Sequence, residues 1–295
     1  MEKKDSQQIK KFVRERYGAH ARERLKGSEA TESDPRVAAT EASCCGPSGV
    51  PATEASCCGL SGAPATTASC CGPATEPSCC GPATEASLLH LCYAADELRD
   101  LPEEALSSLG CGNPTAIAGL KEGEYILDLG SGGGLDCFLA AKKVGPGGRV
   151  VGLDMSADMI QLARRNARSV GAENVQFRLG EMEEMPFPDG SFDVIISNCV
   201  INLSPDKDAV LRECYRVLKH GGRLRVSDIV WTREPEEKER SDLASWTACV
   251  AGALTEADYA SKLRAAGFRE VRVEQKGGPD TPVVNLFSAY ISAEK

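Results

Sequence analysis

Hydrophobic and polar positions alternate from Leu88 onward in a way that predicts a folded α/β domain. Short apolar runs, typical of buried strands, lie at 125–129, 149–153, 175–179, 192–197 and 223–229. Segments with helical spacing of apolar residues separate them, at 136–144, 157–170 and 206–218. Strands that alternate with helices in this way predict a mostly parallel, doubly wound sheet.

Weaker signals surround this alternating region. Pro102 suggests a helix start, because proline is favoured at the first helical position. Gly221 and Gly222 predict a stop after the helix at 206–218. The C-terminal part predicts two further helices and two closing strands, at 241–250, 256–266, 271–275 and 286–291.

The first 26 residues predict an amphipathic helix. Ile9, Phe12, Val13 and Tyr17 recur at the spacing of one helix face, among many Lys, Arg and Glu residues. Such a face needs a partner surface, and we expect the folded domain to provide it.

A low-complexity tract occupies residues 27–87. The unit Ala-Thr-Glu-Ala-Ser-Cys-Cys-Gly-Pro starts at Ala39 and recurs with variations, and it contains almost no aromatic or branched apolar residues. Such a tract cannot offset the entropy lost on ordering, so we predict disorder. We therefore divide the chain into a helix (1–26), this repeat tract (27–87), an α/β core (88–230) and a C-terminal region (231–295).

Charge and composition exclude several function classes. The net charge of −9 and the pI near 5.1 argue against nucleic acid or an anionic membrane as a partner. No apolar run reaches the length of a membrane span, and the charged start resembles no secretory signal. We therefore expect a cytoplasmic protein whose 14 cysteines stay reduced, rather than a secreted disulfide framework.

A glycine-rich turn follows the first strand, and an acidic residue ends the second. The turn contains Gly130, Gly132 and Gly134, a spacing that differs from the G-x-G-x-x-G of pyrophosphate binders. Asp128 within this motif would repel a phosphate but could hold a cationic amino acid group. Asp154 at the end of the second strand could accept both ribose hydroxyls.

This segment, Asp128 to Gly134, resembles the first motif of class I S-adenosylmethionine methyltransferases. The resemblance implies a Rossmann-like fold and S-adenosylmethionine as cofactor. It also implies that Asp154 and Met155 bind the ribose and the adenine edge, that Glu181 to Glu183 border the adenine, and that Asn198 lies near the methionine moiety. The complete cofactor set expected from the motifs and the resemblance is Asp128, Gly130, Ser131, Gly132, Gly134, Asp154, Met155, Glu181, Met182, Glu183 and Asn198.

The cysteines fall into two populations. Eight form adjacent pairs in the repeats: Cys44-Cys45, Cys57-Cys58, Cys70-Cys71 and Cys79-Cys80. Among the single cysteines, Cys199 follows the fourth strand, so we expect it at the mouth of a site beyond the strand ends. Cys111 lies in a glycine-flanked loop before the first strand, and Cys249 in a C-terminal segment; both could cap the same crevice. Cys137 and Cys214 are expected to pack inside, whereas Cys92 has no assigned role.

Together with the initial helix and a Ser-Cys-Cys-Gly-Pro segment, these cysteines are similar to those of arsenite methyltransferases, especially bacterial ones. The resemblance implies methyl transfer from S-adenosylmethionine to trivalent arsenic bound by Cys111, Cys199 and Cys249. It implies arsenite or its glutathione conjugates as substrate. A redox step would use Cys79 or, in our assignment, Cys80, with thioredoxin or glutathione as reductant. A sulfonium beside a cysteine would also lower its pKa.

Two other functions and three roles for the repeats stay open. A quinone or sterol C-methyltransferase would share the cofactor motifs but would need no converging cysteines. A non-enzymatic thiol protein that sequesters metalloids would not need an intact cofactor motif. The repeated pairs could deliver arsenite, store reducing equivalents or be a neutral expansion with incidental binding, which we favour because lengthening a disordered loop costs little.

Overall fold

The computed structural model describes residues 3–32, 92–106, 110, 112–276 and 285–295. Most of the expected disordered tract, with the paired cysteines, lies outside these residues. Cys111 also lies outside them, although its neighbours Gly110 and Gly112 are described.

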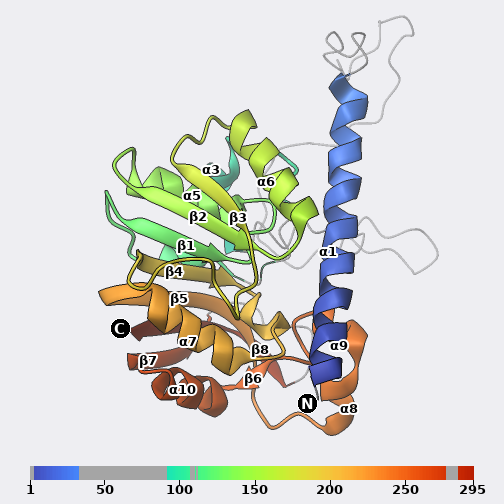
Figure 1. The fold of residues 1–295 in the computed structure, drawn as a ribbon, viewed down its shortest axis with the longest axis vertical. Helices are drawn as coiled ribbons and strands as arrows, with labels where there is room; N and C mark the ends of the chain where they lie inside the picture. Colours follow the sequence, from blue (N-terminus) through green and yellow to red (C-terminus); the bar gives the residue numbers. More distant parts are fainter. Residues whose placement is uncertain (1–2, 33–91, 107–109, 111, 277–284) are drawn as a thin grey trace, which may run out of the picture.

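One eight-stranded sheet forms the centre of the molecule (Figure 1). Its main path runs in the order β3-β2-β1-β4-β5-β8-β7, and a short β6 pairs with β5. β1 to β6 pair in parallel, whereas β8 is antiparallel to both β5 and β7. The strands are β1 (Tyr125–Leu129), β2 (Arg149–Asp154), β3 (Val175–Leu179), β4 (Phe192–Asn198), β5 (Leu218–Trp231), β6 (Leu254–Thr255), β7 (Arg269–Gln275) and β8 (Leu286–Glu294).

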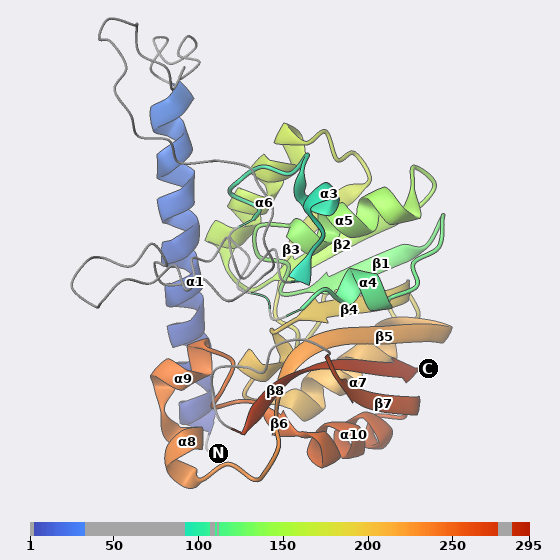
Figure 2. The same ribbon diagram turned by 180° about the vertical axis from the view of Figure 1, so that it is seen from behind.

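Helices cover both faces of this sheet (Figures 1 and 2). The described helices besides the long N-terminal one are α3 (Ala95–Leu98), α4 (Pro114–Ile117), α5 (Leu135–Val144), α6 (Ala157–Ser169), α7 (Lys207–Val217), α8 (Glu237–Ser241), α9 (Leu243–Thr247) and α10 (Glu256–Ala265), with a 3-10 turn η1 (Ile201–Leu203). Of these, α8 and α9 lie beyond the strand ends (Figures 1 and 2). α5 and α6 pack on one face, and α7 and α10 pack on the other. Consecutive strand residues serve opposite faces, as Ile126 joins the α5 cluster and Leu127 the α7 cluster.

A long helix, α1 (Lys3–Glu32), runs beside the sheet rather than on one of its faces (Figures 1 and 2). It lies against α6 and α9. Its buried residues Ile9, Val13 and Ala21 pack against the folded domain, which confirms the partner surface expected from the sequence. The helix extends beyond residue 26, where the amphipathic pattern ends.

The predicted parallel sheet is confirmed, and the differences are local. The helix start predicted at Pro102 is wrong, because residues 103–105 form only a turn with hydrogen bonds from Ala105 N to Pro102 O and from Leu106 N to Glu103 O. The helix predicted at 241–250 is shorter, because α9 covers only Leu243–Thr247, and α8 precedes it and ends at Ser241, before the extended Asp242. Gly221, with φ of 76°, lies inside β5. The pairing of β5 with β4 is irregular there, because its register shifts between Phe192 and Val194.

Candidate functional site

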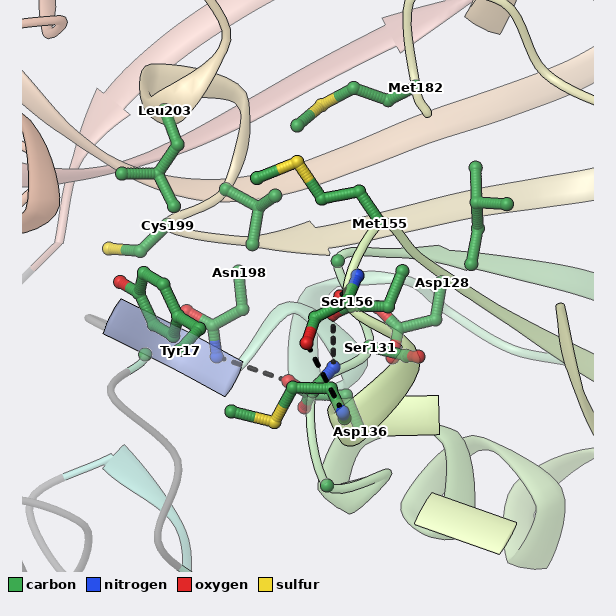
Figure 3. A pocket seen from close by; sticks show the side chains of 18 of the residues that line it. Tyr17, Asp128, Ser131, Asp136, Met155, Ser156, Met182, Asn198, Cys199 and Leu203 are labelled. Atoms are coloured by element: carbon green, nitrogen blue, oxygen red, sulfur yellow. Dashed lines mark hydrogen bonds between the residues drawn. The ribbon is translucent and has the colours of Figure 1, made fainter. Parts of the chain in front are cut away.

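A pocket lies at the carboxyl ends of β1, β2 and β4, where ligands of open α/β sheets bind (Figure 3). Its lining comes from the glycine turn, the ends of these strands and one face of α1. The lining residues are Val13, Arg14, Tyr17, His20, Ala105, Gly110, Asp128, Gly130, Ser131, Gly132, Gly133, Leu135, Asp136, Leu153, Asp154, Met155, Ser156, Met159, Leu162, Gly180, Met182, Glu183, Asn198, Cys199, Val200 and Leu203.

The glycine turn after β1 has a backbone that other residues rarely adopt. Gly130, Gly132 and Gly134 have φ of 66°, 50° and 98°. A β-carbon at Gly130 would lie 2.3 Å from Val200 Cγ1, whereas one at Gly132 would meet nothing within 4 Å. Gly130 is therefore required for close packing. Gly132 leaves its backbone open to the pocket, where a ligand can approach closely.

Asp154, the last residue of β2, lines the pocket and binds the backbone of this turn. Its carboxylate accepts hydrogen bonds from Gly132 N at 3.1 Å and Ser156 N at 2.8 Å. Burial raises the pKa of Asp154, and these backbone donors act in the opposite direction. The residue holds the glycine turn and lines the pocket as the sequence predicts.

Two buried carboxyl groups line the inner end of the pocket. Asp128 accepts a hydrogen bond from Cys137 Sγ at 3.2 Å, and Asp136 accepts one from Tyr93 at 2.9 Å. Burial raises the pKa of Asp136 to about 6. Burial and the nearby Asp136 raise the pKa of Asp128 well above its usual value. Such a pair is suited to a cationic ligand group, whose charge would favour the ionised carboxylates.

Asn198 joins this acidic end of the pocket to the loop that contains Cys111. Its side-chain nitrogen donates to Asp136 at 3.1 Å (Figure 3) and to the carbonyl oxygen of Gly112 at 2.8 Å. Its side-chain oxygen accepts from Gly112 N at 3.3 Å. Asn198 thus lines the pocket, as expected, and also binds the cysteine loop, a role that sequence reasoning missed.

The glycines on either side of Cys111 pack too closely for any side chain. A β-carbon at Gly110 would lie 2.4 Å from Asn198 Nδ2, and one at Gly112 would lie 1.8 Å from Ser227 Oγ. The backbone before and after Cys111 is therefore held against the ends of β4 and β5, next to Cys199.

Cys199 and Cys249 meet beside the pocket. Cys249 Sγ lies 2.8 Å from the carbonyl oxygen of Cys199, and both residues are buried in one cluster with Leu203 and Trp246. Cys199 has φ of 59° and Cys249 of 61°. Only four non-glycine residues in the described part of the chain have positive φ, and such strain gathers at functional sites. Cys199 forms a disulfide bond, so the expectation that every cysteine stays reduced is wrong at this position, whereas the other described cysteines are free.

Charged groups are buried behind Cys249. Burial and the nearby Asp228 raise the pKa of the Cys249 thiol, and the Lys207 ammonium opposes them. Lys207 donates to the carbonyl oxygens of Ser204 at 2.8 Å and Asn202 at 3.3 Å. Asn202 in turn donates to the Cys249 carbonyl at 3.4 Å, so η1 and the Cys249 segment are held together.

The remaining candidates divide between the pocket and other places. Ser131, Met155, Met182 and Glu183 line the pocket. Gly134 and Glu181 are not among the lining residues, and the carboxylate of Glu181 binds Lys10 and Arg14 of α1 instead. Cys137 and Cys214 are buried in the two core clusters, as predicted. The partly buried Cys92 accepts a hydrogen bond from Lys276 at 3.2 Å, outside the pocket lining.

Sequence reasoning missed the contribution of α1. Val13, Arg14, Tyr17 and His20 of this helix line the pocket. Periodicity identified the buried face of this helix, but it contains no information on which part of the domain that face covers. Among the described residues, no group of three or more His, Cys, Asp or Glu is arranged to hold a metal ion.

Comparison with known proteins decides the family. Residues 120–267, half of the 295-residue chain, match the family described as "Methyltransferase domain". The chain belongs to this methyltransferase family. Its fold is that of the class I S-adenosylmethionine-dependent methyltransferases, as the likeness to a solved structure below supports.

No helix in the described ranges is long and apolar enough to span a membrane.

Similar proteins include two curated arsenite methyltransferases. One from Halobacterium salinarum is 49% identical over 63% of this chain and 48% of its own length. One from Aquipseudomonas alcaligenes is 42% identical over 66% of this chain and 56% of its own length. This methyltransferase chain thus spans about half the length of the curated relatives it matches. The solved arsenic(III) S-adenosylmethionine methyltransferase of Chlamydomonas reinhardtii is 34% identical, with a TM-score of 0.57 over 72% of this chain and 74% of that chain.

Proposed function

We propose that this chain is an arsenite methyltransferase in which Cys111, Cys199 and Cys249 bind trivalent arsenic as substrate. The observation that carries the proposal is the meeting of Cys199 and Cys249, both with positive φ, at the wall of the cofactor pocket. The named activity of the similar proteins from Halobacterium, Aquipseudomonas and Chlamydomonas supports it.

The residues of the pocket fit S-adenosylmethionine. The open backbone at Gly132 allows a close approach, and Asp154 can accept ribose hydroxyls while it holds the turn. Asp128 and Asp136 can hold the ammonium of the methionine moiety. Ser131 Oγ is buried without a hydrogen-bond partner among the described residues, so it offers a further polar contact. The cofactor would supply an electrophilic methyl group and leave as S-adenosylhomocysteine.

Arsenic chemistry requires the protein mainly to position its substrate. Three thiolates bind As(III) in a pyramid and leave its lone pair free to form the As–C bond, so no general base is needed. The Asn198 bonds to Gly112 and the Asn202 bond to Cys249 would hold the two outer cysteine segments around Cys199. Fixed geometry of this kind accelerates a reaction by removing the entropy cost of bringing the groups together.

The redox step would follow from the same sulfurs. Methylation formally removes two electrons from arsenic, and two chain thiolates can return them by forming a disulfide. We assign Cys80 as the partner of one arsenic ligand in this step. The disulfide bond of Cys199 supports its sulfur as the one that exchanges. Glutathione or thioredoxin would then reduce the disulfide by thiol exchange.

The site supports a quinone or sterol C-methyltransferase reaction less well. A quinone or sterol substrate would need an apolar space for a ring system beside the methyl donor. Here Cys199, Cys249 and Trp246 pack in one buried cluster at that position, and a carbon substrate would have no use for the two thiols.

Methylation of arsenite by the purified full chain tests the proposal. We expect methylated arsenicals when the chain is incubated with S-adenosylmethionine, arsenite and glutathione. Cys199→Ser and Cys249→Ser should abolish them while S-adenosylhomocysteine still binds. Cys92→Ser is the matched control, since this free cysteine lies away from the pocket, and it should keep full activity. Full activity in both single variants would overturn the assignment.

A further inference from the structure

Helix α1 lies over both halves of the proposed active site. Val13, Arg14, Tyr17 and His20, which share one side of the helix, line the cofactor pocket. Ile9 and Val13 also pack in the same cluster as Cys199 and Cys249. The helix is therefore positioned to contact the cofactor and the arsenic ligands at once.

The imidazole of His20 has an unsatisfied atom in this wall. His20 Nε2 is buried and has no hydrogen-bond partner among the described residues. A buried polar atom without a partner is costly, so its presence in a pocket lining points to a ligand atom that would satisfy it.

Tyr17 connects the two halves. Its hydroxyl donates to the carbonyl oxygen of Thr247 at 3.3 Å, two residues before Cys249. Its side chain packs against the cluster of Cys199 and Cys249, as that of Met155 does, and both residues line the cofactor pocket (Figure 3). A single side chain thus lies between the proposed methyl donor and the proposed arsenic ligands.

Ion pairs hold α1 in this position from both sides. Lys10 Nζ lies 2.7 Å from Glu181 and 3.0 Å from Glu183, and Arg14 lies 2.8 Å from Glu181. Farther along the helix, Arg22 pairs with Asp158 of α6. Gly18 allows this approach, since a β-carbon there would lie 2.8 Å from Asp158 Oδ2.

We propose that α1 forms a wall of the cofactor site, in which His20 and Tyr17 contact S-adenosylmethionine directly and Tyr17 ties this wall to the Cys249 segment. The inference rests on the proposed function for the identity of the ligand. The recognised chemistry is that of an adenosyl-amino acid, with hydrogen-bonding groups for the imidazole and an apolar body for the phenol ring.

Binding of S-adenosylhomocysteine to the full chain tests this inference without an activity assay. Titration calorimetry should show a dissociation constant raised about tenfold by His20→Ala and about tenfold by Tyr17→Ala. Tyr17→Phe keeps the ring and should bind within about threefold of wild type. Phe12→Ala alters an exposed residue of the same helix and should bind as wild type does.

Hydrogen exchange gives a second readout that needs no variant. Amides of residues 13–20 should exchange several-fold more slowly in wild type when S-adenosylhomocysteine is added. Affinities within twofold of wild type in both alanine variants, or unchanged exchange in this segment, would overturn the role of α1. A wild-type chain that binds no S-adenosylhomocysteine would instead overturn the proposed function itself.

Discussion

At the scale of single residues, Asn198 connects the two ligands that the proposed reaction requires. Its amide group binds Asp136 at the acidic end of the cofactor pocket and Gly112 beside Cys111. The sequence places Asn198 at the end of a strand, and hence near the cofactor. Its bond to Gly112 was not predictable, because 86 residues separate the two and only the folded sheet brings them together.

The buried carboxyl of Asp136 predicts a pH-dependent stability. Burial raises its pKa to about 6 in the folded chain, above the unfolded value of roughly 4. The protonated form is therefore favoured on folding, so the stabilisation is present at low pH and is lost as the pH rises through about 6. The raised pKa of Asp128 changes the free energy of unfolding with pH in the same direction. Urea denaturation should show the free energy of unfolding falling by on the order of 2 kcal/mol between pH 5 and pH 8.

Asp136→Asn should flatten this pH dependence, whatever its effect on stability at a single pH. Asp100→Asn, which alters a carboxyl that is 75% exposed, serves as the control and should keep the wild-type slope. An equal slope in wild type and Asp136→Asn would show that Asp136 does not titrate as proposed.

The glycines beside Cys111 predict a second residue-scale effect. Gly112→Ala would force a β-carbon against Ser227 Oγ and displace the loop, at a cost of about 1–3 kcal/mol in folding free energy. We expect arsenite affinity to fall at least tenfold while S-adenosylhomocysteine affinity changes less. Fluorescence titrations would measure both affinities. Gly147→Ala, where the atom nearest to the added β-carbon would lie 3.9 Å away, is the matched control. Unchanged arsenite affinity in Gly112→Ala would contradict the placement of Cys111.

At the scale of elements, the alternation of strands and helices was predictable and the packing of α1 was not. Buried runs such as 125–129 and 192–197 identified the strands because both faces of a parallel sheet exclude water. The break between α8 and α9 at Asp242 precedes a segment whose Trp246 packs in the Cys199 cluster. No local pattern predicts that contact.

Glu181 predicts how α1 is held. Glu181→Ala removes the partner of Arg14 and one of the two carboxylate partners of Lys10, and because both cations are at least partly exposed we expect a loss of no more than about 1 kcal/mol. Hydrogen exchange of α1 amides should nevertheless become several-fold faster. In wild type, high salt should also speed this exchange, because it screens the ion pairs. Glu184→Ala, which removes no ion pair with α1 in the described residues, should leave the exchange unchanged. Equal protection of α1 in the two variants would contradict this attachment.

At the scale of the whole molecule, the proposed site is a meeting of distant segments at one sheet edge. β4 positions Cys199, the segment after α9 brings Cys249 against it, and Gly110 and Gly112, which flank Cys111 in the sequence, pack against the ends of β4 and β5. The first three repeated cysteine pairs lie outside the described residues, and we propose that they are not required for methyl transfer, unlike the last pair, which contains Cys80. Deleting residues 39–73 should leave the rate of methylation unchanged even at low arsenite. A rate that falls only at low arsenite would instead show that the repeats deliver the substrate.

The number of sulfur atoms around bound arsenic tests the central claim most directly. Arsenic X-ray absorption would be measured on the full chain loaded with one equivalent of arsenite, with its eight paired cysteines replaced by serine to remove competing thiols. We expect three sulfur neighbours of arsenic in the chain without the paired cysteines, and two after the further change Cys249→Ser. A shell dominated by oxygen, or three sulfurs that persist without Cys199 or Cys249, would contradict this claim.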